Sequence, residues 1–177
     1  GPDNSSFWNK EFLALHDGYG NKAKGVLEFK QYFRKFNKSF EDDSAIWDDM
    51  HNHMPRIRYI DMYGGEPMLM KKQWKLLKHA ITEGYSKNIS LHYNTNGTLW
   101  DEEKFNILNE FKNISMDFSL DGIYNRFEFM RHPAKWEPVI KNFNTLKDIS
   151  KTNKKFHISI AHTVSSLNIW YIPEFME

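Results

Sequence analysis

The chain has 177 residues and a mass of 21.2 kDa, is 40% hydrophobic and 16% aromatic, and contains no cysteine. That length and apolar content support one domain with a substantial core, and the balance of 24 basic against 23 acidic residues gives no reason to expect nucleic acid as a partner. The lack of cysteine excludes disulfides and thiolate ligands within this chain, and with no signal peptide or long apolar segment we expect a cytoplasmic protein without a membrane partner.

The first 55 residues predict helices rather than strands. One helix is expected near residues 5–15, and a second follows an apolar stripe over residues 26–36. A third is expected over residues 41–50, which begin with acidic side chains.

Strands and helices alternate after this helical segment, which is typical of a parallel sheet. The predicted strands cover residues 57–62, 89–93, 114–120 and 156–164. The helix after the first strand is expected to bury an apolar stripe and to expose lysines; the stripe is Met70, Trp74, Leu77 and Ile81.

The remaining connections predict two more helices. The helix after the second strand begins at Asp101, whose charge suits the positive end of a helix dipole. A long loop is expected after the third strand. The last helix follows it and buries a stripe made of Trp136, Val139, Phe143 and Leu146.

The third strand alternates strictly between apolar and polar residues, with Ile114, Met116 and Phe118 on one face and Ser115 and Asp117 on the other. Parallel strands covered by helices on both faces normally read as continuous apolar runs. We therefore expect helices on the outer face only and a polar inner face, as in a barrel or half-barrel that binds ligands at the carboxyl ends of its strands.

Each predicted strand is followed by a short polar motif. The four motifs are Gly64-Gly65-Glu66-Pro67, Asn94-Thr95-Asn96-Gly97, Ser119-Leu120-Asp121-Gly122 and Ser165-Ser166-Leu167-Asn168. Any one alone is an ordinary turn signal, but all four in register with strand–helix units favour a binding site. Paired glycines lack Cβ atoms, so their carbonyls can approach a ligand's cationic amino group.

In this order the first three motifs resemble those of the radical S-adenosylmethionine (SAM) enzymes, especially members with a twitch or SPASM extension. The resemblance covers most of the chain from Asp61 to Asn168. It implies an α/β fold, a partial (β/α)6 TIM-like half-barrel with a parallel sheet. The hypothesis is a single incomplete core domain over residues 1–177, truncated at both ends, with a mostly helical segment over 1–55 and successive strand–helix units over 56–177.

The resemblance also assigns SAM-binding residues. It places Gly64, Gly65 and Glu66 at the SAM amino group, with Pro67 completing the motif, and Ser119 in contact with SAM. Arg131 matches the arginine that binds the methionine carboxylate, a task that suits its planar fork, although an arginine in a long loop can also be a solvated surface residue.

Two further SAM contacts, Asn96 and Asn168, are weaker assignments, because asparagine in a turn often serves its own backbone. No catalytic residue and no metal ligand is assigned. The eight histidines show no metal-binding spacing, although His92 and His157 can face the polar side of the sheet.

The chain departs from the family in having no cysteine for the cluster loop, Cys-x3-Cys-x2-Cys, whose three thiolates bind a [4Fe-4S] cluster. The hypothesis is that this loop precedes Gly1. The intact parent would take an electron from a donor, cleave SAM reductively and form a 5′-deoxyadenosyl radical that abstracts hydrogen from an unknown substrate, with a peptide as the suggested class. This chain alone would be inactive.

The alternative is a cysteine-free α/β module that binds a nucleotide or a protein without redox chemistry.

Overall fold

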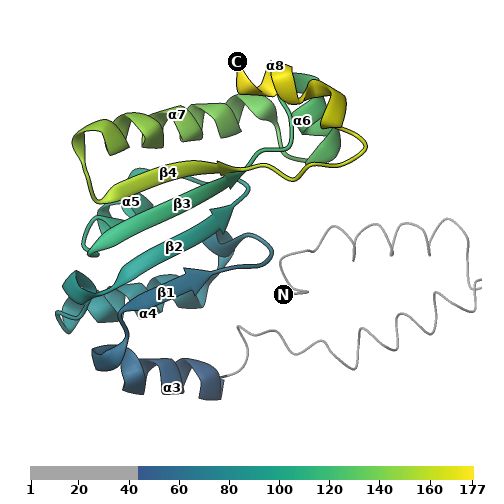
Figure 1. The fold of residues 1–177 in the computed structure, drawn as a ribbon. Coiled ribbons are helices and arrows are strands. Elements are labelled where there is room, and N and C mark those ends of the chain that lie inside the picture. The colour runs from purple at the N-terminus through teal and green to yellow at the C-terminus, as the bar shows by residue number, and fades with distance from the viewer. Residues whose placement is uncertain (1–43) are drawn as a thin grey trace, which may run out of the picture.

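The computed structural model describes residues 44–177, which form a parallel sheet with helices packed along one side (Figure 1). The strands are β1 (Tyr59–Met62), β2 (Ser90–Thr95), β3 (Asn113–Ser119) and β4 (Phe156–Ala161). The helices are α3 (Ser44–His53), α4 (Lys71–Thr82), α5 (Glu102–Leu108), α6 (Tyr124–Met130), α7 (Trp136–Thr152) and α8 (Ile172–Met176). The predicted α/β class is therefore confirmed.

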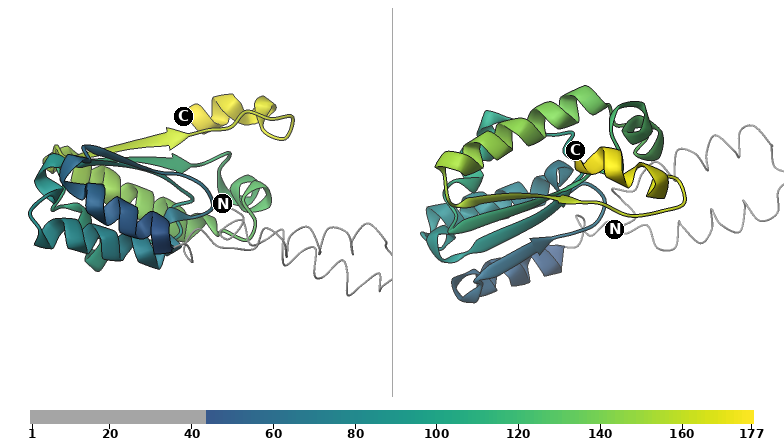
Figure 2. Two further views of the ribbon diagram at one scale, coloured as in Figure 1. Left: turned by 90° about the horizontal axis from the view of Figure 1, so that it is seen from below. Right: turned by 45° about the horizontal axis from the view of Figure 1, so that its top comes forward.

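The strands lie in the order β1-β2-β3-β4, and every neighbouring pair is parallel. Crossovers between parallel strands are almost always right-handed, so a sheet that grows in one direction places all its connecting helices on the same side. Figure 2 shows this arrangement, with the helices below the strands in its left view. The opposite face of the sheet carries no helix from the β1–β4 connections.

Burial follows the alternation that the sequence predicted. On the helix side, Leu91, Tyr93, Ile114 and Phe118 are at most 1% exposed. The intervening residues of β2 and β3 are polar or aromatic and only half-buried. The polar second face of the parallel sheet, predicted from the sequence, is thus confirmed.

The stripe predicted for α7 is confirmed, since Trp136, Val139, Phe143 and Leu146 are all buried. The stripe predicted for α4 is partly wrong. Of its members only Leu77 is fully buried, and the other three are partly buried against the core. The fully buried residues also include Gln73, Leu76 and Ala80. The helix is rotated because the Gln73 amide donates to the carbonyl of Pro67 and its oxygen accepts from the Tyr93 hydroxyl, which draws this polar residue into the core.

Two predicted elements need correction after β3. The long loop contains a helix, α6, which packs its buried Phe127 edge-on against Trp136. The fourth strand ends at Ala161 rather than at residue 164, because the chain then turns into a loop held by Asn168. Of the predicted N-terminal helices, the first two lie outside the described residues, and the third corresponds to α3.

Within residues 44–177, no helix is both long enough and apolar enough to cross a membrane.

Candidate functional site

The four strand-end motifs lie along one edge of the sheet. All four strands run parallel, so their carboxyl ends point the same way, as the arrowheads in Figure 1 show. The loop after β1 carries Gly64 to Pro67, and Asn96 directly follows β2. Ser119 is the last residue of β3, and Asn168 follows β4. Ligands of α/β sheets bind at this edge.

The paired glycines form the turn at the end of β1. Gly64 has a φ of 85° and Gly65 a φ of 53°, in the left-handed region that side chains disfavour. A chain that turns in this way keeps its main-chain groups accessible from the loop side. The turn is followed by buried Pro67, which begins a short 3-10 helix.

Glu66 fixes this turn to the neighbouring strand. Its side chain is 2% exposed. One carboxylate oxygen accepts from the N–H of Met68 at 3.1 Å and from the Thr95 hydroxyl at 2.8 Å. The other accepts from the N–H of Asn96 at 2.7 Å. Burial raises the pKa of Glu66, and these hydrogen bonds lower it in part. Both oxygens are used within the protein, so Glu66 shapes the site through the loop that it holds.

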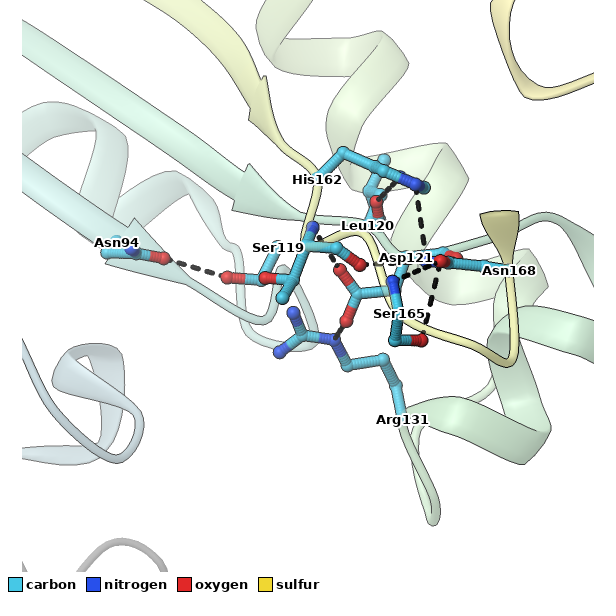
Figure 3. Close-up of polar contacts among 9 residues, drawn as sticks. Asn94, Ser119, Leu120, Asp121, Arg131, His162, Ser165 and Asn168 are labelled. Carbon is cyan, nitrogen blue, oxygen red and sulfur yellow. Dashed lines mark hydrogen bonds and ion pairs between the residues drawn. The ribbon is translucent and has the colours of Figure 1, made fainter. Parts of the chain in front are cut away.

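Asn96 and Ser119 lie on the same edge. The Asn96 side-chain oxygen accepts from the N–H of Thr98 at 2.9 Å and from its hydroxyl at 2.6 Å, so part of its role is local. The Ser119 hydroxyl donates to Asn94 at 2.7 Å, which joins β3 to β2 (Figure 3). Both side chains are half-buried, and both stay predicted contacts.

Arg131 pairs with Asp121 beside Ser119. Nε of Arg131 lies 2.6 Å from a carboxylate oxygen of Asp121. The terminal guanidinium nitrogens turn away from that carboxylate in Figure 3. No hydrogen bond joins them to any other residue in the range 44–177. The two terminal nitrogens of Arg131 are therefore available to a ligand at the edge of the sheet where the strands end.

Asn168 is 2% exposed, and its amide group is fully engaged. Its Nδ2 donates to the carbonyls of Asp121 at 3.0 Å and Thr163 at 2.8 Å, and its oxygen accepts from the N–H of Ser165 at 2.7 Å. The predicted contact with SAM stays a prediction, and in this structure the amide instead ties the loop after β4 to the end of β3.

A charged bridge that sequence reasoning did not find spans the polar face. His92 Nδ1 lies 2.7 Å from Asp61 on β1, and Nε2 lies 3.1 Å from Asp117 on β3. The Asp117 carboxylate also accepts from the Ser159 hydroxyl. Burial lowers the pKa of His92, but its hydrogen bonds to the two carboxylates outweigh that effect and raise the pKa overall. His92 and Asp117 are half-buried and Asp61 is exposed, so the bridge faces the space over the sheet.

This bridge predicts a pH dependence of stability. Because the folded-state pKa of His92 is raised, the bridge contributes fully below the unfolded value of about 6.5 and is lost as pH rises through the folded value. As the pH rises from about 6 to about 9, we expect the free energy of unfolding to fall by about 1–2 kcal/mol more in the native chain than in His92→Gln. Denaturant titrations from about pH 6 to about pH 9 measure it, and parallel curves for the two chains would contradict the prediction.

Comparison with known proteins identifies the family of the chain. The family model of the radical SAM superfamily matches residues 21–177. A curated protein, the sporulation killing factor maturation protein SkfB of Bacillus subtilis (strain 168), is 25% identical over 118 residues. That match covers 67% of this chain and 27% of SkfB, so the chain spans about a quarter of that protein.

Two groups belong to this family's chemistry, and the described residues fit one of them. The free fork of Arg131, the Gly64-Gly65 turn and the end of β3 suit the amino-acid end of SAM. A [4Fe-4S] cluster needs thiolate ligands, and the sequence has no cysteine. Both the motifs and the family match lead to one conclusion: the chain belongs to the radical SAM superfamily.

Proposed function

We propose that this chain is the SAM-binding part of a radical SAM enzyme, with residues 1–177 belonging to one core domain. The observation that carries the proposal is the fork of Arg131, whose terminal nitrogens have no partner within residues 44–177 and which lies at the ligand edge of the sheet. A guanidinium is the side chain that binds a carboxylate through two parallel hydrogen bonds.

Each proposed contact matches one part of SAM's amino-acid end. The methionine carboxylate would lie on Arg131, with the Ser119 hydroxyl nearby. The ammonium group would lie against the carbonyls of Gly64 and Gly65, which Glu66 and Pro67 hold in place. The Asn96 amide nitrogen would contribute from the end of β2, and Asn168 would shape the rim. In this family, bound SAM supplies the radical that abstracts hydrogen from a substrate. These residues contribute only binding and orientation.

The [4Fe-4S] cluster does not fit the residues of this chain, because no thiolate is present to hold it. No step of the proposed function therefore runs through the cluster, or through the electron donor that would reduce it.

For the substrate we propose a peptide. SkfB is named as the maturation protein of a sporulation killing factor, and maturation acts on a product that already exists. The polar face of the sheet, with the Asp61–His92–Asp117 bridge and the exposed rings of Tyr59 and Tyr63, offers hydrogen-bonding and aromatic contacts for such a chain.

Arg131→Ala tests the SAM site. We expect SAM binding to weaken by about tenfold, because a bidentate charged pair contributes about 1.5–3 kcal/mol. Titration calorimetry with SAM measures the affinity. The matched control is Arg58→Ala, since within residues 44–177 Arg58 donates only to the nearby carbonyls of Pro55 and Ile57, before β1.

The outcomes separate the two functions considered. Unchanged SAM affinity in Arg131→Ala would contradict the assigned role of this arginine. If ATP displaces SAM as well as S-adenosylhomocysteine does, the chain recognises the adenosine alone, and the nucleotide-binding module is the better description.

A further inference from the structure

We propose that Asp121 is the positioning residue of the SAM site and that it holds the Arg131 guanidinium in the orientation that a carboxylate can bind. The proposal rests on the proposed function, because it takes Arg131 as the residue that meets the SAM carboxylate. Asp121 lies two residues after the end of β3, is 7% exposed, and has no assigned contact with SAM.

The carboxylate of Asp121 is held at both oxygens. One oxygen accepts from the N–H of Thr163, after β4, at 2.8 Å. The other lies 2.6 Å from Nε of Arg131. That nitrogen is buried and makes no hydrogen bond within residues 44–177, so this ion pair is its contact with the protein there. The main-chain carbonyl of Asp121 is fixed as well, by Nδ2 of Asn168 at 3.0 Å. Figure 3 shows the cluster.

These contacts divide the guanidinium into two parts. The Nε side is committed to a carboxylate that the ends of two strands fix in place. The two terminal nitrogens stay available to a ligand, and the contact at Nε orients the guanidinium plane in which they lie. A free arginine side chain has rotamer entropy, which a ligand would otherwise have to overcome on binding. Asp121 removes part of that cost before SAM arrives.

Asp121 also joins the end of β3 to the segment after β4, so a stability effect alone would not identify its role. The two roles differ in one respect. Positioning acts only through Arg131, whereas a structural link acts whether or not Arg131 is present.

A double-mutant cycle on SAM affinity separates them. In Asp121→Asn the amide oxygen can still accept from Thr163, but the amide nitrogen meets Nε donor to donor and the ion pair is lost. We expect Asp121→Asn to weaken SAM binding by about tenfold in the native chain and by less than about twofold in the Arg131→Ala background. Titration calorimetry on the whole chain gives all four affinities.

The matched control is Asp101→Ala. It removes the cap of α5, where the Asp101 carboxylate accepts from the N–H of Lys104 at 2.9 Å, so it lowers stability away from the site. Its SAM affinity should match that of the native chain.

A second measurement needs no variant. In NMR spectra of the native chain, the Nε–H of Arg131 should exchange with water at least about tenfold more slowly than that of exposed Arg56, because it is buried in the ion pair.

The outcomes are distinct. Equal losses of affinity in both backgrounds, or an Arg131 Nε–H that exchanges as fast as that of Arg56, overturn the positioning role and leave the SAM site standing. If Arg131→Ala alone leaves the affinity unchanged, the SAM role of Arg131 and the positioning role of Asp121 fail together.

Discussion

Gly97→Ala should destabilise the fold by about 3 kcal/mol, of which about 1–2 kcal/mol is the backbone cost of a left-handed alanine and the rest is overpacking. Gly97 has a φ of 72°, and a Cβ there would lie 2.6 Å from two ring carbons of Phe118 and 3.2 Å from Val139. Phe118 is 1% exposed and packs edge-on against Phe143, so the ring cannot yield freely. Chemical denaturation measures the change.

Gly84→Ala is the matched control. Gly84 has a φ of 77°, but an added Cβ meets no atom within 4 Å. It should therefore show the backbone cost alone, about 1–2 kcal/mol. The difference between the two variants isolates the close packing of the turn after β2 against the core. Equal costs would contradict the packing argument.

Glu66→Gln should cost about 2 kcal/mol of stability and also weaken SAM binding, because glutamine offers one acceptor oxygen where the carboxylate offers two. The buried carboxylate accepts from Met68, Thr95 and Asn96. In the variant an amide nitrogen would face a donor on one side, and that donor would be left unpaired. Relief of the buried charge offsets only part of this loss. Thermal unfolding and titration with SAM measure the two effects.

Glu103→Gln serves as the control for Glu66. Glu103 is exposed and forms a 2.9 Å ion pair with Lys78 on the outer surface. Exposed pairs of this kind contribute about 0–1 kcal/mol. A Glu66→Gln chain as stable as the Glu103→Gln chain would show that the Glu66 hydrogen bonds do not hold the loop after β1.

Much of the fold follows from local pattern. The strict alternation of the third strand predicted both a sheet and its two faces, and the alternation of strands with helical stripes predicted parallel pairing. The stripe of α7 was predicted residue by residue, because its large apolar side chains recur at helical spacing and no polar side chain competes for the core. In α4 such competition exists, and Gln73 is buried by partners outside its own helix.

The candidate site divides in the same way. The glycine pair, Ser119 and Arg131 are suggested by short motifs and by spacing. Asp121 stands within a motif, but its tie to Arg131 could not be read from the sequence, since loop conformation decides which side chains meet. The His92 bridge is similar, because Asp61 lies 31 residues away and Asp117 lies 25 residues away.

The sequence by itself therefore determined the α/β class, the polar face of the sheet, the edge that carries the strand-end motifs and the family resemblance, because each depends on periodicity or on a contiguous motif. Only the tertiary structure decided which side chains are free to bind. Glu66 and Asn168 read as ligand contacts in the sequence, yet their polar atoms are taken up by distant backbone groups. The terminal nitrogens of Arg131 stay available because the turn through α6 brings Nε, and not those nitrogens, next to Asp121.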